Sequence, residues 1–274
     1  MIEGTAADDP AGGGRRLLLS EFLRDRRRAL KPEDVGLRVS RGPRRVAGLR
    51  REEVAVLADV GITWYTWLEQ GRPIRVAPGT LERIADALRL DRHERAYLHL
   101  LAFGNATPAP WNAALPENLI HVVRSYAAGP AYVLGPRWDV LAWNETFARV
   151  FRFPRTEAGD RNALRHAFLN ADMPALFVDW PVQARSIVST FRVRYAAHVG
   201  DDAFESLVAE LTEKSALFAE LWRASDVLTP TDARSARLRA SSAQPMLYSG
   251  VTLIVPDLPE TTVVFGLIGG DEAG

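Results

Sequence analysis

Residues 51–71 read REEVAVLADVGITWYTWLEQG, and this stretch decides the fold of the first part of the chain. The inner face of a first short helix is made by Val54, Leu57 and Ala58. A turn at 59–61 follows, and a second helix is predicted from Ile62 to Gln70. Gly71 comes just past its end, where glycine often takes the left-handed conformation. Two short helices joined by such a turn are typical of a DNA-binding helix-turn-helix.

The second helix divides into two faces when its residues are turned by about 100° each. Tyr65 and Leu68 are expected to be buried, and Thr63 points almost directly away from them. The residues predicted to meet the DNA groove are Ile62, Thr63, Trp64, Thr66 and Trp67. For Trp64 and Trp67 a role in the fold stays an alternative, because helical aromatic residues are more often core than contact.

Charge is unevenly distributed, although the chain as a whole is neutral. Between Arg15 and Arg75, fourteen arginines and one lysine accompany eight acidic residues, which gives a net charge of +7. Between Ala106 and Gly274 the net charge is −4. A basic segment of this kind favours a polyanion as its partner. The arginines predicted to contact DNA phosphates are Arg44, Arg45, Arg50, Arg51, Arg72 and Arg75.

The chain divides into two predicted domains. Helical patterns with short connections cover residues 15–104 and predict an all-helical bundle. Residues 1–14, rich in Gly, Ala and Asp, are predicted to be a disordered leader. Residues 105–117, rich in Pro, Ala and Asn, are predicted to be a linker to a second domain at 118–270.

The second domain mixes strand and helix signals. AYVL and RWDVLAW, at 131–134 and 137–143, are runs of β-formers separated by a Gly-Pro turn, and Asn144 is an expected N-cap. The clearest single helix is predicted at 202–223, and two strands at 245–255 and 261–269 close the chain. Strands at both ends with helices between them predict the α+β class.

Aromatic side chains of the second domain are candidates for lining an apolar pocket. They are Trp138, Trp143, Phe147, Phe151, Phe168, Phe177, Trp180, Phe191, Tyr195, Phe218 and Trp222. Arg185 and Arg192 lie on one predicted helix, where one of them is a candidate partner for a carboxylate head group. The alternatives are an ordinary hydrophobic core for the rings and structural salt bridges for the arginines.

A family resemblance covers both domains. FLRDRRRALKPEDVGL, RRVAGLRREEVAVLADVGITWYTWLEQGR and LERIADALRLDRHERAYLHLLA resemble the N-terminal domain of the MmyB-like branch of the XRE (phage-repressor-type) transcriptional regulators. GPAYVLGPRWDVLAWNETFARVF and TFRVRYAAH resemble the MmyB-type ligand-binding domain, which is similar to a PAS fold. Asp59 and Gly61 depart from the family pattern, which usually has Gly in the turn and Ser or Thr as the cap.

The resemblance carries specific implications for function. It implies base contacts from Ile62, Thr63, Trp64 and Trp67, with phosphate contacts from Arg51 and Arg75. It also implies a PAS-like antiparallel sheet covered by helices, which holds a fatty acid or similar lipid. We therefore expect a helix-turn-helix bundle followed by this PAS-like ligand-binding domain.

Several classes of function are disfavoured. The chain has no cysteine, which excludes disulfides and thiolate metal sites. No P-loop, G-x-S-x-G, H-E-x-x-H or dinucleotide fingerprint is present, and the five histidines lack metal spacing. We therefore predict no enzymatic activity, no metal and no cofactor. The start of the chain has no signal-peptide pattern and no apolar run reaches membrane-spanning length, which predicts a cytoplasmic protein without membrane insertion.

The sequence thus predicts a transcriptional regulator that binds specific double-stranded DNA and responds to a small apolar ligand such as a fatty acid. We expect a homodimer, because two recognition helices on adjacent major grooves match a two-fold operator. Two alternatives stay open. One is a lipid-binding sensor or dimerisation protein that acts through a protein partner, and the other is an unrecognised enzyme that uses the pocket of the second domain.

Overall fold

The computed structural model describes residues 10–37, 48–104, 114–153, 161–224, 235–239, 245–255 and 258–270. These residues divide into two compact units. The first holds the described residues up to Gly104 together with Tyr195–Glu205, and the second holds the others. Within the described part of the chain, no helix is both long enough and apolar enough to cross a membrane.

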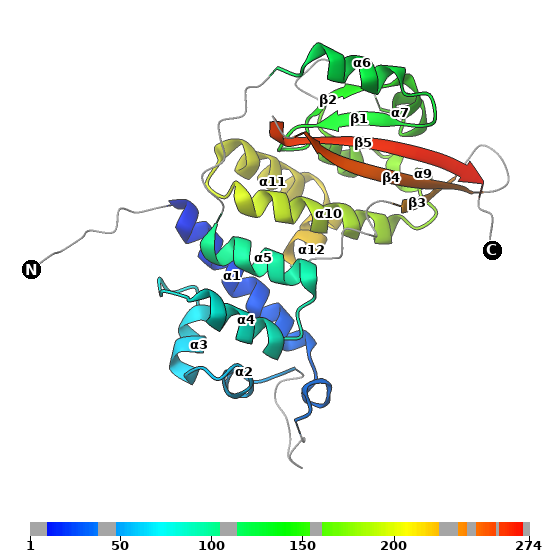
Figure 1. The fold of residues 1–274 in the computed structure, drawn as a ribbon. Coiled ribbons are helices and arrows are strands. Elements are labelled where there is room, and N and C mark those ends of the chain that lie inside the picture. Colours follow the sequence, from blue (N-terminus) through cyan, green and yellow to red (C-terminus); the bar gives the residue numbers. More distant parts are fainter. Residues whose placement is uncertain are drawn as a thin grey trace, which may run out of the picture. The chain divides into compact units, whose positions relative to one another are not determined.

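The first unit is built from helices (Figure 1). They are α1 (Pro10–Ala29), a short 3₁₀ helix η1 (Pro32–Val35), α2 (Arg51–Leu57), α3 (Ile62–Glu69), α4 (Pro78–Ala87) and α5 (Arg92–Phe103). Their apolar faces meet in one core, whose largest fully buried members include Phe22, Leu23, Leu49, Tyr65, Leu81, Ile84 and Leu98. The predicted all-helical bundle is therefore confirmed.

Local signals in the sequence set where these helices start. Asp91 caps α5, because its side chain accepts hydrogen bonds from the backbone of His93 and Glu94, each at 2.8 Å. Glu94 reaches back to the backbone N–H of Asp91 at 2.9 Å, which completes a capping box. Pro78 occupies the first turn of α4, where the missing N–H of proline costs nothing.

The predicted disordered leader is too long. Helix α1 begins at Pro10, so residues 10–14 are helical, while residues 1–9 lie outside the described part of the chain. Proline suits the first position of a helix. The helix formed by the apolar segment that follows therefore extends back through the glycines to Pro10. The predicted linker ends one residue too late, because α6 already begins at Glu117; residues 105–113 are also outside the described part.

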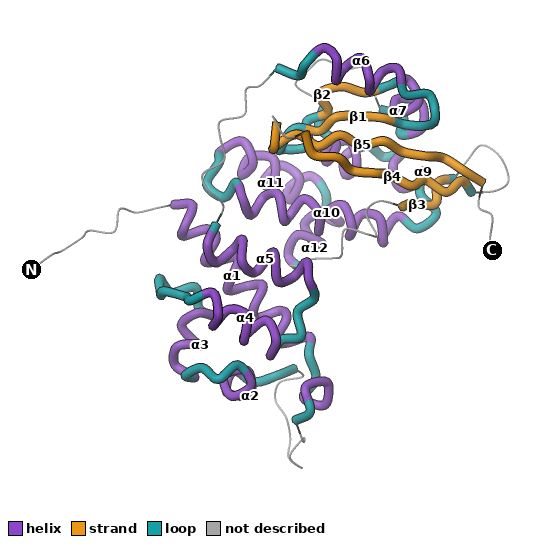
Figure 2. Tube along the Cα trace, viewed as in Figure 1, coloured by secondary structure: helices purple, strands orange, loops and turns teal. Residues whose placement is uncertain are grey.

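The second unit combines a sheet with helices (Figure 2). Its helices are α6 (Glu117–Ser125), α7 (Glu145–Val150), α8 (Ala163–Leu169), α9 (Met173–Leu176), α10 (Trp180–Ala197), α11 (Asp202–Lys214) and α12 (Ala216–Arg223), although the end of α10 and the start of α11 belong to the first unit. Its strands are β1 (Ala131–Leu134), β2 (Val140–Trp143), β3 (Ser235–Leu238), β4 (Met246–Val255) and β5 (Leu258–Gly270). This arrangement confirms the predicted α+β fold class.

The five strands form one antiparallel sheet in the order β2-β1-β5-β4-β3. Helix α6 covers one face, where its buried Val123 packs with Ala131 and Val263. Helix α10 follows the other face: Arg194 hydrogen-bonds the Thr262 side chain of β5, and Gln183 hydrogen-bonds the Ser235 carbonyl of β3. The sheet therefore has a helix on each side, as Figure 1 shows.

The predicted start of the sheet is confirmed. Strand β1, a turn and strand β2 are followed by Asn144, whose side-chain oxygen accepts a hydrogen bond from the Phe147 backbone at 2.8 Å and so caps α7. The same oxygen accepts the Ala131 N–H at 3.0 Å, and the amide nitrogen donates to the Tyr126 and Gly129 carbonyls. One buried side chain thus joins the start of β1 to the start of α7.

Three features of the second unit differ from the prediction. The single helix expected at 202–223 is two helices, because Ser215 ends α11 and caps α12 by accepting the Phe218 N–H at 3.2 Å. Three strands, not two, close the chain, since the four-residue β3 pairs with β4. The one-turn helix α9 at Met173–Leu176 was also not expected.

Candidate DNA-binding surface and ligand pocket

The turn between α2 and α3 contains a left-handed residue that is not glycine, which is an unfavourable backbone conformation. Asp59 has a φ of +50°, the left-handed region that glycine adopts most readily. Gly61 caps α3 without a side-chain hydrogen bond, so the helix lacks the acceptor that a serine or threonine provides. At the other end Gly71 has a φ of +72°, and its N–H reaches the Leu68 carbonyl at 3.0 Å. The predicted ending of α3 at Gly71 is therefore confirmed.

Helix α3 presents one face to the core and another to solvent. Tyr65 is fully buried and Leu68 is only 3% exposed, which confirms the predicted inner face. On the outer face Thr63 is exposed, and Ile62 and Trp67 are 44% and 39% exposed. Trp64 is half-buried and packs on the core, so it supports the fold from the boundary of the helix. Thr66 is also half-buried.

Trp67 is paired with an arginine at the surface. The Arg72 guanidinium carbon lies 5.6 Å from the centroid of the Trp67 ring, within cation–π range. Both side chains are exposed, as is Arg75. The end of α3 and the loop after it therefore present an aromatic ring and positive charge on the same surface.

A buried carboxylate holds α3 in place, and sequence reasoning did not identify it. Glu69 has no exposed surface, and its carboxylate accepts two hydrogen bonds from Arg27 of α1, at 2.6 and 2.7 Å. Arg51 of α2 reaches the same carboxylate at 2.8 Å. The Ser20 hydroxyl donates to the Glu69 carbonyl at 2.6 Å, and Arg27 also donates to the Leu49 carbonyl at 2.7 Å. Residues from α1 and α2 thus fix the orientation of α3.

The two arginines determine the charge state of this carboxylate. Burial alone raises the pKa of Glu69, but hydrogen bonds and charges from Arg27 and Arg51 outweigh burial and bring the pKa below its usual value. Burial also raises the pKa of the neighbouring Tyr65. Glu69 is therefore ionised at neutral pH, and its charge is matched within the protein.

The predicted phosphate-contacting arginines are in different positions. Arg72 and Arg75 are exposed beside the end of α3, and Arg50 is exposed before α2. The side chain of Arg51 is 41% exposed, but its guanidinium is engaged by Glu69. Arg44 and Arg45 lie outside the described residues.

In the second unit, most of the predicted pocket aromatics form a continuous chain of ring contacts. In order, the rings are Trp138, Phe191, Trp222, Phe218, Phe168, Trp180 and Phe177, with neighbouring centroids 5.2 to 6.2 Å apart. Trp143 and Phe147 belong to a second cluster around Phe153, with centroids 5.5 and 5.2 Å from it. The predicted set is thus divided between two groups.

The predicted head-group arginines have other surroundings. Arg192 is 2% exposed, and its guanidinium donates to the Leu221 and Trp222 carbonyls at the end of α12. Its carbon also lies 4.4 Å from the Trp222 ring centroid, so Arg192 holds the end of that helix. Arg185 is exposed. Tyr195 falls in the first unit, where its hydroxyl donates to Glu205 at 2.9 Å.

A pocket of about 220 Å³ lies where α8, α9, α10 and the start of α12 meet. Of the predicted pocket aromatics, Phe168 and Trp180 line it. Leu169, Ser215 and Leu217 also line it, and the prediction of one continuous helix through 215 concealed the last two. No lining side chain is ionisable.

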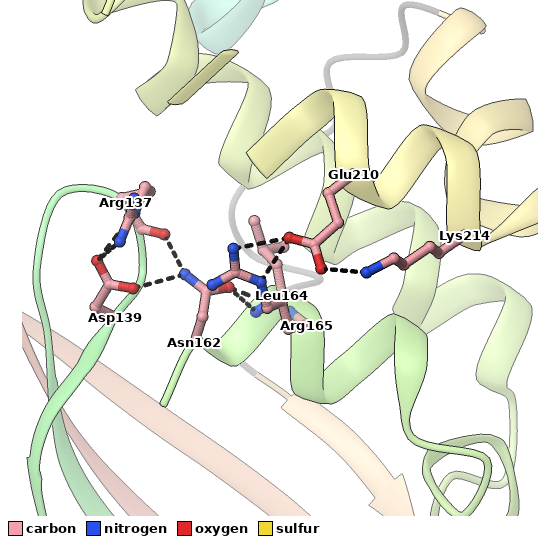
Figure 3. Close-up of polar contacts among 7 residues, drawn as sticks. All are labelled: Arg137, Asp139, Asn162, Leu164, Arg165, Glu210 and Lys214. Atoms are coloured by element: carbon pink, nitrogen blue, oxygen red, sulfur yellow. Dashed lines mark hydrogen bonds and ion pairs between the residues drawn. The ribbon is translucent and has the colours of Figure 1, made fainter. Parts of the chain in front are cut away.

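Polar contacts fix α8, which supplies part of this lining (Figure 3). Asn162 is fully buried, and its amide nitrogen donates to the Arg137 carbonyl at 2.8 Å and to Asp139 at 3.0 Å. Its oxygen accepts the backbone N–H groups of Leu164 and Arg165, which caps α8. The turn between β1 and β2 is thereby joined to the start of α8.

Comparison with protein families gives two matches in the order of the two units. The family described as MmyB-like transcription regulator ligand binding domain matches residues 115–273, more than half of the chain. A helix-turn-helix domain family matches residues 18–98. The chain belongs to the MmyB-like transcription regulators. A comparison with curated proteins found no match.

Membership in the MmyB-like regulators gives the two domains their roles. The helix-turn-helix of this regulator binds DNA, and its second domain binds a small molecule. In this MmyB-like chain the α3 surface lies within the helix-turn-helix match, and the pocket between α8 and α12 lies within the ligand-binding-domain match. Within these two domains, Glu69 holds α3 in place and Asn162 holds the start of α8.

Proposed function

We propose that this MmyB-like regulator recognises its operator with the exposed face of α3 and that an apolar ligand, such as a fatty acid, controls it through the second unit. The observation that carries the DNA proposal is the division of α3. Thr63 and Trp67 face solvent, while Tyr65 and Glu69 are fixed in the interior. A rigid helix with one open face suits a major groove, which admits an α-helix.

The outer face offers chemistry suited to base edges. The Thr63 hydroxyl donates or accepts hydrogen bonds, and the Thr63 methyl and the Trp67 ring offer apolar contact to a thymine methyl. Arg72 and Arg75 supply positive charge for phosphates, which position the protein without reading sequence. Loss of a groove contact should therefore lower affinity for operator DNA only, whereas loss of a phosphate contact should lower affinity for any DNA.

The test compares binding to operator DNA and to random DNA. The operator is first recovered by crosslinking the regulator to DNA in cells. Replacing Thr63 with Ala is expected to lower operator affinity by about tenfold, from the 1–3 kcal/mol of a base contact, and to leave random-DNA affinity unchanged. Equal losses on both DNAs would contradict groove reading by Thr63.

Arg75 provides the matched phosphate test. Arg75→Ala is expected to weaken both DNAs and to reduce the salt dependence by about 0.9 in log–log slope. Arg75→Lys keeps the charge and should keep that slope. Arg51 is less informative, because its replacement also disturbs the buried Glu69 carboxylate.

For the ligand, the support is the apolar, uncharged pocket beside a chain of aromatic rings. Native mass spectrometry of the full chain, purified without detergent, is expected to retain an apolar molecule of fatty-acid mass. A protein that stays empty after exposure to a lipid extract would contradict ligand control. We further propose that the regulator acts in the cytoplasm as a homodimer on a two-fold operator and has no catalytic activity.

A further inference from the structure

The two ends of α3 are held in different ways. At the C-terminal end, the buried Glu69 carboxylate pairs with arginines of α1 and α2. At the N-terminal end, Gly61 provides no side-chain cap, so the first helical residues, Ile62 and Thr63, depend on the turn that precedes them. Both residues are exposed and belong to the face of α3 that meets DNA in the proposed function. Their direction therefore depends on how firmly the turn at 58–61 is fixed.

The turn begins as the end of α2. The Asp59 N–H donates to the Val56 carbonyl at 3.2 Å. The Val60 N–H donates to the Ala55 carbonyl at 2.9 Å. This pair of bonds goes with the left-handed conformation of Asp59, whose φ of +50° is unfavourable for a residue other than glycine. No backbone N–H of the described residues hydrogen-bonds the Ala58 carbonyl, which is the next acceptor along the chain.

Arg83 of α4 supplies the partner of that carbonyl. Its Nε donates to the Ala58 carbonyl oxygen at 3.0 Å. Within the described residues, this is the one side-chain hydrogen bond that reaches the turn at 58–61. Helix α4 is in place to make it, because Leu81 and Ile84, which flank Arg83, are buried in the same core as α2.

A guanidinium suits this position. The carbonyls at the end of a helix carry partial negative charge, and a hydrogen bond from a charged donor is stronger than one from a neutral donor. The terminal nitrogens of Arg83 make only long contacts within α4, at 3.4 Å to the Gly79 carbonyl and at 3.4 Å to the Thr80 hydroxyl. The bond to the turn is therefore the strongest that this side chain makes.

We propose that Arg83 is a positioning residue for operator recognition, because its bond to the Ala58 carbonyl fixes the turn and with it the direction of the first residues of α3. The inference rests on the proposed operator reading by α3 and names a residue outside the reading face on which that reading depends. Without this bond, operator binding has to order the turn first, which lowers affinity. Random DNA is held through its phosphates and does not depend on the direction of Thr63.

Affinities of the full chain for operator and random DNA, measured over a range of salt concentrations, test this role. The ratio of the two affinities is the operator preference. Arg83→Met is expected to lower this preference about tenfold, because a hydrogen bond from a charged group is lost. The salt dependence should not change, because Arg83 contacts a carbonyl and not a phosphate. Arg83→Lys keeps the charge but places a methylene where Nε donates, so it should show the same loss; it also serves if Arg83→Met fails to fold.

Arg95→Met is the matched control. Arg95 makes the same kind of bond at the end of α4, from its Nε to the Leu90 carbonyl at 3.0 Å, away from the turn before α3. The variant also loses ion pairs with Glu82 and Asp86, so it is expected to be less stable than the parent. It should keep the full operator preference. Loss of stability is thereby separated from loss of recognition.

A second substitution in the turn provides a rescue that a positioning role predicts. Asp59→Gly allows the left-handed conformation at little cost, so the turn depends less on the bond from Arg83. Added to Arg83→Met, it is expected to restore operator preference by about threefold to fivefold. Added to the parent, whose turn is already held, it should change the preference by less than about twofold.

The outcomes separate this inference from the proposed function. Loss of operator preference in Arg83→Met, with recovery on adding Asp59→Gly, supports it. A salt slope that falls by about 0.9 in Arg83→Met indicates a phosphate contact and overturns it. An unchanged preference in Arg83→Met and Arg83→Lys, while Thr63→Ala lowers the preference, overturns the inference and leaves operator reading by α3 standing. If Thr63→Ala also keeps the preference, the proposed function fails and the inference fails with it.

Discussion

At the scale of single residues, the buried carboxylate of Glu69 stabilises the position of α3. A carboxylate without exposed surface is costly unless its oxygens are paired, and here Arg27 and Arg51 supply that pairing at 2.6 to 2.8 Å. The three residues come from three different helices of the first unit. The position of α3, and with it the direction of Thr63 and Trp67, thus depends on one side chain that faces away from solvent.

Replacing Glu69 with Gln tests this dependence. The variant leaves the Arg27 guanidinium buried without its counter-charge, which is expected to lower the free energy of unfolding by about 3–5 kcal/mol. Urea-induced unfolding followed by circular dichroism measures the loss. Glu52→Gln is a control, because Glu52 is an exposed acid of α2, and it should change stability by less than about 0.5 kcal/mol.

The same residue gives a pH dependence of known sign. Because the folded-state pKa of Glu69 lies below the ordinary glutamate value of 4.5, its stabilisation is fully present above about pH 4.5 and is lost as pH falls through the folded pKa. The Gln variant is expected to lose less stability than the parent between pH 5 and acid conditions. Parallel acid-unfolding curves for parent and variant would contradict this assignment.

The sequence revealed the burial of some residues and not of others, for a physical reason. Helical periodicity separated Tyr65 and Leu68 from Thr63 because it depends only on neighbours within one helix. From the sequence alone, Glu69 is a polar residue at the end of the same helix, which predicts that it is exposed. Its burial depends on Arg27 and Arg51, which are 42 and 18 residues away, and periodicity carries no information about such partners.

At the scale of elements, Asn162 connects two segments that have no regular pairing beyond one bridge. It caps α8 with its oxygen and holds the β1–β2 turn with its nitrogen, and an isolated bridge joins it to Asp139. In the same turn Trp138 has a φ of +64°, an unfavourable conformation for a large side chain. The hydrogen bonds from Asn162 therefore hold the β1–β2 turn in a conformation that is unfavourable for Trp138.

Asn162→Asp is expected to remove the hydrogen bonds to the β1–β2 turn and to keep the hydrogen bonds that cap α8. The new carboxylate would stand where the Asn162 nitrogen now lies, 3.0 Å from an Asp139 oxygen, so two carboxylates would repel each other. We expect a loss of about 2–4 kcal/mol at pH 7 that shrinks at acid pH, where one group binds a proton. Asn170→Asp, at the other end of α8, is the control and should lack this acid recovery.

Elements were predictable where a signal was long and local. The strand-turn-strand start of the sheet was predicted correctly because Asn144 gives a cap signal directly after a strand. The break at Ser215 was missed because the apolar positions keep helical phase across it: Leu211 and Phe218 are both buried. Strand β3 has only two buried side chains, Ala236 and Leu238, too few for a visible alternation.

At the scale of the whole molecule, the face of the sheet that α6 covers at β1 stays exposed along β4 among the described residues. Leu247, Val251 and Leu253 alternate along β4 and are 40–58% exposed, and Leu267 of β5 is 54% exposed. Val251 and Leu253 pair in register with Phe265 and Val263, which pack in the core under α6. The band thus continues an existing core outward, and the exposed Arg237 of β3, the register partner of Leu247, lies at its edge.

An apolar band of this kind allows two copies to meet over its aliphatic side chains, which agrees with the homodimer that we propose for a two-fold operator. Stable interfaces bury roughly 800 Å² on each partner, and four partly exposed aliphatic side chains provide only part of that area. We therefore expect a dimer that dissociates on dilution and that operator DNA stabilises by holding both copies.

Val251→Glu tests this arrangement. The substitution places a charge in the band, and a two-fold interface brings two such charges together, so the dimer is expected to weaken at least tenfold. Thr252→Glu adds the same charge to the next residue of β4, which faces the opposite side of the sheet, and should leave the dimer unchanged. Sedimentation of the full chain over a range of concentrations, with and without operator DNA, measures both variants. Because circular dichroism shows first whether each variant folds, a folded Val251→Glu protein that dimerises like the parent would mean that another surface joins the two copies.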